Sequence, residues 1–268
     1  MSKIEVVLQL QRSAQALGHS PQRREIPSLA MKCYNEFGSF NKAKIEAGLD
    51  IKNKKIDKFP KRAFELDKDL AAIISYITFD GHLYKNFRGL FYSSKNLSDL
   101  QEFEKVMRRK FGFKGNYHLN NSGSRKQTHV IYFFSKRVCE FLFKIGVPKG
   151  DKAIQVFDVP LWIQESKEFS REYLKIAFLC EGSLEREEGR NPRISFIQAK
   201  EINIIDSGLN FMSTIKSMLN KFEIKTGKSG ISKLSRVRKR DNKMTKDIKF
   251  RIRTSDSNRF ISEISWLK

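Results

Sequence analysis

Two stretches of the sequence place an acid and a glycine at the end of an apolar run. They read LAAIISYITFDGHLY, from Leu70, and YLKIAFLCEGSL, from Tyr173. Each run predicts about two helical turns, followed by Asp80–Gly81 or Glu181–Gly182 and then by strand-like residues. A carboxylate there is poorly placed, because the last carbonyls of a helix already carry partial negative charge. One such acid is most simply a solvated cap. Two in a repeated context indicate an all-oxygen site for magnesium or a similar hard ion.

These residues resemble the two signature helices of a single-chain LAGLIDADG homing endonuclease. The nine-residue motif corresponds to Ile73–Gly81 in the first copy and to Leu174–Gly182 in the second. The resemblance implies an α+β fold with two pseudo-symmetric αββαββα halves, whose antiparallel sheets form a saddle for DNA. It also implies a monomeric, intron-encoded endonuclease that cuts double-stranded DNA at specific sites.

The chemistry implied by the resemblance is metal-assisted hydrolysis of phosphodiesters. The eighth motif position is the family's metal-binding acid, and Asp80 and Glu181 occupy it here. The carbonyls of Phe79 and Cys180 are expected to complete the coordination of Mg²⁺ or another divalent cation such as Mn²⁺. The ions would activate water and stabilise the leaving oxygen.

The resemblance implies further catalytic residues around the acids. The family has a glutamine on the second strand of the first hairpin, which Gln198 matches in the second half and Ser93 replaces in the first. It also has a lysine after the last helix of each half, which Lys149 and Lys268 match approximately. We therefore expect these four side chains near the paired acids.

An ordered series of correspondences supports an internal duplication. Glu181 lies 101 residues after Asp80, and Lys200 in SFIQAKE lies 105 residues after Lys95 in LFYSSKN. The offset grows at the expected loops, which predicts longer hairpins in the second copy. The expected domains are a helical module at 1–50, a basic linker at 51–64, the first half at 65–150, a bridge at 151–172 and the second half at 173–268.

The motif positions where the two helices would pack differ in size between the copies. The third positions are Ser75 and Ile176, and the seventh are Phe79 and Cys180. If like positions meet across the pseudo-twofold axis, each contact pairs a small residue with a large one. The two volumes would then compensate each other.

The composition favours a polyanionic partner. The 268 residues carry a formal net charge of +22, and 40% of them are hydrophobic, with 22 Phe, so the chain can bury a sizeable core. The pI is near 9.9. Such a surplus on a folded protein indicates binding to nucleic acid. We expect double-stranded DNA as the partner, with intron RNA as an alternative.

The same residues argue against other classes of protein. Cys33, Cys139 and Cys180 have no CxxC spacing, which predicts a reducing intracellular compartment and no zinc site. The four histidines show no ligand spacing typical of metalloproteases or HNH nucleases. We expect no membrane association, because the longest apolar runs have about half the length of a membrane helix and the N-terminus lacks a signal-peptide core.

The first 50 residues predict three short helices with glycine-containing turns. LGHSPQRRE at 17–25 and FGSFNKAKIEAGL at 37–49 resemble the homing-endonuclease-associated repeat, a small module found beside such nucleases. A generic three-helix bundle is the alternative. If the resemblance holds, five polar side chains are candidates for contacts with the DNA backbone. They are Arg23, Arg24, Lys32, Asn41 and Lys42.

One face of each predicted sheet is expected to carry polar side chains into a major groove, because strand residues alternate between faces. The candidates on that face are Tyr84, Arg88, Arg125, Lys126, Arg190, Arg193, Arg251 and Arg253. The most basic stretch is centred on Arg236, Arg238, Lys239 and Arg240, which we expect in a long loop at the flank of the DNA site. A solvated basic loop or a localisation signal is the alternative.

Two functions remain open on the sequence alone. The first is a site-specific DNA endonuclease, which the retention of both Asp80 and Glu181 favours. The second is a non-cleaving nucleic-acid-binding protein on the same scaffold, such as an intron RNA maturase or a transcription regulator. The asymmetric residues Phe79 and Ser93 keep this second function open.

Overall fold

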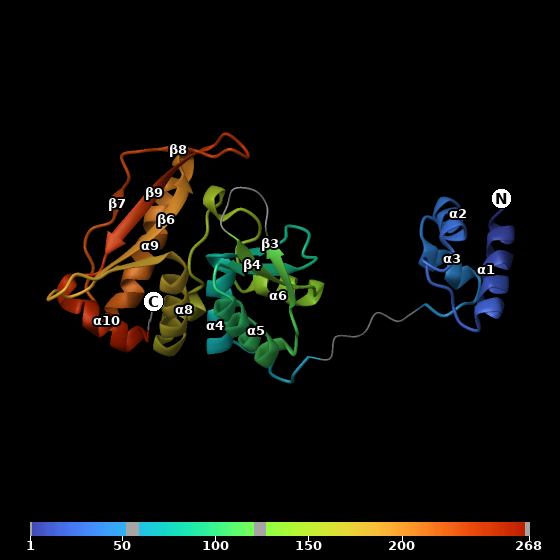
Figure 1. Ribbon diagram of the computed structural model, residues 1–268, viewed down its shortest axis with the longest axis horizontal. Coiled ribbons are helices and arrows are strands. Elements are labelled where there is room, and N and C mark those ends of the chain that lie inside the picture. The colour runs from blue at the N-terminus through green and yellow to red at the C-terminus, as the bar shows by residue number, and fades with distance from the viewer. Residues whose placement is uncertain (1, 52–58, 121–126, 266–268) are drawn as a thin grey trace. The chain divides into compact units, whose positions relative to one another are not determined.

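The chain divides into two compact units, Met1–Lys58 and Phe59–Lys268 (Figure 1). The computed structural model describes residues 2–51, 59–120 and 127–265. The second unit begins inside the expected linker at 51–64, so that expectation is wrong for its last residues. Phe59 packs against Phe64 and Phe113, and Phe64 packs against Phe141. These aromatic contacts attach the segment to the body of the second unit.

The first unit is the expected bundle of three helices. Ser39 caps the third helix by accepting a hydrogen bond from the Lys42 amide, and Gly18 ends the first helix at a φ of 68°. Pro27 occupies the first turn of the second helix. Val6, Leu10, Cys33 and Phe40 contribute to a small core of this unit's own. The helices are α1 (Lys3–Leu17), α2 (Pro27–Phe37) and α3 (Phe40–Glu46).

The first half of the second unit has the predicted order of helix, hairpin, helix, hairpin and helix. Its helices are α4 (Lys68–Thr78), α5 (Leu97–Phe111) and α6 (Lys136–Lys144). Its strands are β1 (Gly81–Leu83), β2 (Leu90–Ser94), β3 (Asn116–Asn120) and β4 (Thr128–Phe133). They form an antiparallel sheet in the order β1-β2-β4-β3. The helices cover one face, because alternate strand residues such as Leu90, Tyr92, Ile131 and Phe133 are buried in the core.

The second half repeats this plan with longer strands. Its helices are α8 (Lys167–Glu181), α9 (Ile205–Asn220) and α10 (Ser257–Ile264), with the 3-10 turns η2 (Ile202–Ile204) and η3 (Thr254–Asp256). Its strands are β5 (Gly182–Glu185), β6 (Arg193–Glu201), β7 (Gly230–Ile231), β8 (Arg236–Val237) and β9 (Met244–Arg251). The order is β5-β6-β9-β7, and β8 also pairs with β9. The edge strand that corresponds to β3 of the first sheet is therefore split into two short strands, β7 and β8.

The bridge between the halves contains η1 (Lys152–Ile154) and α7 (Leu161–Glu165). It ends earlier than residue 172, because α8 already begins at Lys167. The expected anchoring by Pro160 and Trp162 is present. The Trp162 indole donates a hydrogen bond to the Ile145 carbonyl at 3.1 Å. A Cβ on Gly146 would lie 2.4 Å from Pro160 Cγ, so the glycine permits the ring to pack there.

Helices α4 and α8 pack side by side and join the two halves into one core (Figure 1). The Ser75 hydroxyl, on α4, donates a hydrogen bond to the Tyr173 carbonyl, on α8, at 2.8 Å. The Phe79 ring crosses into the second half, where it packs against Tyr173, Phe196 and Phe211. The large seventh-position residue of the first copy is therefore accommodated by the core of the second half.

Candidate active site and nucleic-acid interface

The paired acids follow the ends of the two packed helices. Helix α4 stops at Thr78, two residues before Asp80, whereas α8 continues to Glu181. Gly81 and Gly182 do not act as left-handed helix caps. Each lets the chain leave its helix where a side chain would collide with the backbone of the preceding turn. A Cβ on Gly81 would lie 2.7 Å from Ile77 Cα, and one on Gly182 would lie 2.3 Å from the Phe178 carbonyl oxygen. Glycine at these positions thus fixes where each acid leaves its helix.

The carboxylates of Asp80 and Glu181 both lie close enough to Cys180 and Lys152 to influence their pKa values. Burial raises the pKa of the Cys180 thiol, and the charges of Asp80 and Glu181 raise it further. Burial also lowers the pKa of Lys152 to about 8, and the same two carboxylates oppose that shift. Both acids therefore act on one thiol and on one ammonium group. The expected meeting of the two helix ends is present, and it includes a lysine that the sequence analysis did not single out.

The Lys152 ammonium group sits at the C-terminal end of α4. It donates hydrogen bonds to the carbonyls of Ile77, at 3.0 Å, and Gly81, at 2.5 Å, and to that of Phe79. A cation is favourable there, because the helix end carries partial negative charge. The Phe79 carbonyl was expected to coordinate metal, but here it accepts a hydrogen bond from Lys152. Its coordination of a metal stays a prediction, because a carbonyl oxygen has a second lone pair.

The remaining donors fit a hard divalent ion. No group of three or more His, Cys, Asp and Glu side chains suited to a metal gathers in the described parts of the chain. Asp80 and Glu181 offer carboxylate oxygens, which suit hard cations such as magnesium or manganese. Magnesium commonly binds through one or two carboxylates and takes its other ligands from water and substrate phosphates. The two carboxylates of Asp80 and Glu181 match that pattern of protein ligands.

Ser93 and Gln198 differ in their relation to the site. The Ser93 hydroxyl donates a hydrogen bond to the backbone carbonyl of Asp80 at 3.2 Å, so it lies beside the first acid. The register pairs Gly81 with Tyr92 and Gly182 with Phe196, which makes Ile197, not Gln198, the counterpart of Ser93. The expected equivalence was wrong by one residue.

The one-residue shift puts Gln198 on the opposite face of its strand. It alternates with Ile197 and lies on the side of Phe196, which is buried in the core. Gln198 is only 7% exposed, and its buried Oε1 has no hydrogen-bond partner among the described residues. An amide inside the core on the helix-covered face does not present itself to a DNA groove.

Lys149 packs on aromatic rings and does not supply the expected lysine. The Lys149 ammonium group lies over the rings of Phe87 and Phe143, at 4.9 and 4.5 Å from their centroids. Lys268 is outside the described residues. Lys152, three residues after Lys149, is the lysine that reaches the acids. The sequence around Lys152 contains no motif that predicts this position, because the turn at Gly150–Lys152 contacts α4 only in the folded chain.

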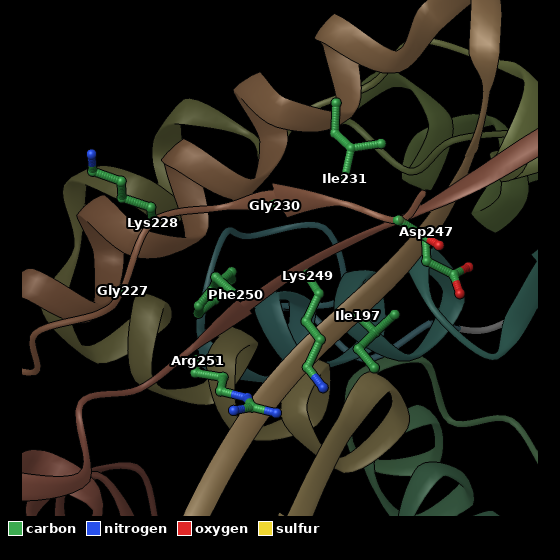
Figure 2. Close-up of a pocket in the computed structure, with 10 residues that line it drawn as sticks. Ile197, Gly227, Lys228, Gly230, Ile231, Asp247, Lys249, Phe250 and Arg251 are labelled. Carbon is green, nitrogen blue, oxygen red and sulfur yellow. The ribbon is translucent and has the colours of Figure 1, made fainter. Parts of the chain in front are cut away.

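The outward face of the second sheet carries cationic side chains. Figure 2 shows Lys249 and Arg251 of β9 with their charged ends on the same side as Ile197 of β6. Arg251 and Arg253 are exposed, as expected. Lys249 was missed, although the alternation in Lys249–Arg253 marks it as outward-facing.

The other predicted arginines of the second half form ion pairs with acids. Glu187 pairs with Arg190 at 2.7 Å and with Arg193 at 3.0 Å. The expected basic loop is instead a hairpin formed by β8 and β9, in which Arg236 pairs with Asp247.

Two arginines of this hairpin reach the bridge. Arg238 and Arg240 both pair with Asp151, the residue before Lys152. Only 11% of the Arg238 side chain is exposed, so the hairpin is packed against the bridge at this point rather than extended into solvent. Lys239, between the two arginines, is exposed.

The remaining candidates for DNA contacts lie on the first sheet and, separately, on the helical module. The Arg88 guanidinium stacks on the Tyr84 ring at 4.5 Å. Arg125 and Lys126 lie outside the described residues. All five candidates of the helical module are exposed, which leaves them accessible to a partner. They are Arg23, Arg24, Lys32, Asn41 and Lys42.

Comparison with known families and proteins places the first unit directly. Residues 1–50 match the model of the homing endonuclease associated repeat. The replication factor C small subunit of Methanocaldococcus jannaschii is 25% identical over 206 residues, which are 73% of this chain and 11% of that protein. The tRNA-splicing ligase RtcB of Pyrococcus furiosus is 27% identical over 173 residues, which are 59% of this chain and 18% of that protein. The chain thus spans less than a fifth of either relative.

Several solved structures align with this chain at low sequence identity. Mesophilic variants of the homing endonuclease I-DmoI align with a TM-score of 0.46 and 12% identity, covering 76% of this chain and 97% of theirs. Full-length DUF199/WhiA from Thermatoga maritima aligns with a TM-score of 0.47 and 12% identity, covering 77% of this chain and 60% of its own.

Helices in the described residues are all too short or too polar to cross a membrane.

The three helices of the first unit, with their caps, lie within the same residues that match the repeat. The duplicated order of elements around α4 and α8 agrees with the architecture that the signature helices imply. Residues 1–50 are therefore a homing endonuclease associated repeat, and the unit that follows has the two-copy αββαββα fold expected of a LAGLIDADG protein.

Proposed function

We propose that this protein is a metal-dependent endonuclease that cuts double-stranded DNA at specific sites. The observation that carries the proposal is the convergence of Asp80 and Glu181, whose charges both act on Cys180 and Lys152. Two carboxylates beside a DNA-binding surface would only repel phosphates. A divalent cation between them and the backbone removes that repulsion, which gives the arrangement a chemical purpose.

Each residue has a distinct part in this proposal. Asp80 and Glu181 hold Mg²⁺ or Mn²⁺, which when bound activates water and stabilises the leaving oxygen. Ser93 fixes the backbone of Asp80 through its hydrogen bond to the carbonyl. Lys152 keeps a positive charge beside the acids at neutral pH, because its pKa remains near 8 despite burial. That charge is placed to balance the negative charge that develops on the phosphate.

The second candidate is a nucleic-acid-binding protein that does not cut, with DNA or intron RNA as its partner. The Lys152 ammonium group at the Phe79 carbonyl favours it, because a lysine already supplies positive charge where a metal ion is expected. The retention of both acids on adjacent helix ends favours the nuclease. We adopt the nuclease, acting as an intron-encoded monomer whose two halves face the two strands.

A cleavage screen tests the proposal without knowledge of the target sequence. The full chain is incubated with a library of duplex DNA containing randomised sites, in Mg²⁺ and, as the matched control, in EDTA. The proposal predicts that a narrow set of sequences is cut in Mg²⁺ alone. Specific binding of duplex DNA with no cleavage in Mg²⁺ or Mn²⁺ would instead support the non-cleaving candidate.

A further inference from the structure

The outward face of the first sheet is covered by aromatic rings. Phe91, on β2, and Tyr132, on β4, are opposite each other in the strand register and point away from the buried Tyr92 and Phe133. Phe134 follows on the same side as Tyr132 and is 59% exposed. None of the three outward rings belongs to the core of the unit. This face is therefore a separate aromatic surface, which we call the aromatic face.

The rings contact one another across all four strands. His82, on β1, stacks on Phe91 at a centroid distance of 5.2 Å. Phe91 contacts Tyr132 at 5.5 Å, and Tyr132 contacts His118, on β3, at 5.2 Å. Phe134 lies parallel to Tyr132, with centroids 6.2 Å apart and planes inclined by 3°. The contacts hold the rings in fixed positions, so a ligand that binds them need not order them first.

The aromatic face also contains a depression with polar groups at its edge. The depression has a volume of about 550 Å³, within the range of sites for small planar ligands. Its lining includes Tyr132 and Phe134, with His118 and Asn120 as hydrogen-bonding groups and Arg88 as a cation. None of the outward strand positions in the described part of this sheet is an acid. The surface thus combines flat rings, hydrogen-bonding groups and positive charge.

The second sheet is different at its outward positions. Where the first sheet has Phe91 and Tyr132, the second has Ser195 and Arg251, which are also paired. Ser195 is buried and hydrogen-bonded to Ser183, whereas Arg251 is exposed. An exposed arginine suits the phosphates and base edges of a duplex, whose stacked bases hide their flat faces. Aromatic rings suit unpaired bases, whose flat faces are free for stacking. The asymmetry indicates that the two sheets recognise different features of nucleic acid.

We propose that the aromatic face binds unpaired bases of single-stranded nucleic acid by stacking. This function goes beyond cleavage of duplex DNA and does not depend on it, because it uses none of the paired acids. Tyr132 and Phe134 provide the stacking surface, His118 and Asn120 contact base edges, and Arg88 contacts a phosphate. The chemistry is the same for RNA and for single-stranded DNA, since both offer unpaired bases on a charged backbone.

The test compares four labelled ligands of equal length by fluorescence anisotropy with the full chain. They are an RNA strand, a DNA strand, a DNA duplex and an abasic DNA strand that keeps the phosphates and lacks the bases. Because stacking on one aromatic side chain changes affinity by roughly tenfold or more, the two strands with bases should bind at least about tenfold more tightly than the abasic strand. The ratio of RNA to DNA affinity identifies the natural source of the bases.

Three variants locate the binding on the protein. Tyr132→Leu and Phe134→Ala should each weaken binding of the base-bearing strands by about tenfold and weaken duplex binding by a clearly smaller factor. Phe134 is exposed enough that its loss should not affect folding. Tyr117→Leu is the matched control, because Tyr117 is a 40% exposed ring on β3 that points to the other face and donates a hydrogen bond to Glu104. It should have no effect.

Photochemical cross-linking gives a readout that does not depend on affinity. A strand containing bromouracil, irradiated on the protein, should become attached to the peptide that carries Tyr132 and Phe134. The proposal is overturned if the abasic strand binds as well as the others, or if the ring variants leave single-strand binding unchanged. It is equally overturned if they weaken duplex and single-strand binding by the same factor, because the face would then serve the duplex.

Discussion

At the scale of single residues, the buried Lys200 is the least expected feature of the second half. Its side chain is fully buried on β6, where it donates hydrogen bonds to the carbonyls of Lys152, at 2.8 Å, and Gln155, at 3.1 Å. Its ammonium group also lies 3.7 Å from the centroid of the Phe157 ring. Lys200 thus ties the sheet to the bridge segment that carries Lys152. The sequence offered Lys200 only as a marker of duplication.

The burial of Lys200 predicts a dependence of stability on pH. Burial and then the charge of Lys152 lower the pKa of Lys200 to about 8, whereas an unfolded lysine titrates near 10.4. Between these values the unfolded chain binds more protons, so the free energy of unfolding should rise with pH. From pH 8 to about 9.5 we expect a rise of roughly 1–2 kcal/mol that depends on Lys200. Denaturant titrations of the wild type and of Lys200→Met at both pH values measure it.

The pH window and a control keep that prediction specific. The pKa values of Tyr92 and Tyr173 are raised in the folded protein. Above about pH 10 the titration of these tyrosines therefore lowers the free energy of unfolding, so the comparison stops at a lower pH. Lys246→Met, which replaces a lysine facing Lys200 in the register, should keep the full rise. An equal rise in the wild type and Lys200→Met would show that Lys200 does not titrate as described.

The candidate site could be predicted in part from single residues. Asp80 and Glu181 were identified because each ends an apolar run beside a glycine, a pattern visible in one dimension. Lys152 was missed because its contacts with α4 form between segments more than 70 residues apart. Gln198 was made equivalent to Ser93 because it is a glutamine on the corresponding strand, but residue type does not reveal strand register, which is set by the partners of Gly81 and Gly182.

At the scale of elements, the hairpin of β8 and β9 is joined to the bridge by Asp151. Burial alone would raise the pKa of this carboxyl, but the hydrogen bond from Arg238 and the nearby cationic charges lower it overall. Asp151 also accepts the Ala153 amide hydrogen bond at 3.1 Å, so one side chain holds both the hairpin and the turn at Lys152. The hairpin that was expected to reach DNA is thereby tied to the acidic site.

This contact predicts that Asp151→Asn loosens the hairpin. The variant keeps an oxygen for the Ala153 amide but loses the charge that holds Arg238 and Arg240. Since Arg238, Lys239 and Arg240 are trypsin sites, limited proteolysis followed by mass spectrometry should show faster cleavage there than in the wild type. Glu187→Gln, which weakens the ion pairs with Arg190 and Arg193 in another hairpin, is the control and should leave the rate unchanged. Equal rates in all three proteins would contradict the role of Asp151.

Most elements could be predicted because their signals are local. Ser39 and Gly18 mark helix ends by their own side chains and dihedral angles, and alternation marks the strands. The segment from Phe59 to Phe64 was wrongly assigned to a linker because its basic neighbours dominate the composition. Its partners Phe113 and Phe141 lie about 50 to 80 residues away, so only the folded chain reveals its burial.

At the scale of the whole molecule, the repeat at residues 1–50 has its own core and the catalytic candidates all lie in the second unit. We therefore predict that a protein beginning at Phe59 folds and still cleaves at high concentration but binds its site more weakly. The repeat contributes to DNA affinity through exposed cations, so its removal should weaken binding most at low salt. Affinity and cleavage rate, measured for both proteins over a range of salt concentrations, test this.

A full-length variant separates charge from mere presence of the repeat. Replacing Arg23, Arg24 and Lys42 by alanine removes exposed cations but leaves the core of the repeat intact. It should reproduce most of the loss seen on truncation. Unchanged affinity in the truncated protein would mean that the repeat does not bind the DNA target.

The central claim is that Asp80 and Glu181 together hold a catalytic metal, and paired measurements on Asp80→Asn and Glu181→Gln test it most directly. Binding is assayed in Ca²⁺ and cleavage in Mg²⁺, with Glu223→Gln, an exposed acid elsewhere in the second half, as the control. Both site variants should still bind DNA in Ca²⁺, and without metal they should bind at least as tightly as the wild type, because the removed carboxylates repel phosphates. Each should lose cleavage by several orders of magnitude, because metal stabilisation of the transition state contributes several kcal/mol. Cleavage at the wild-type rate in either variant would contradict the account.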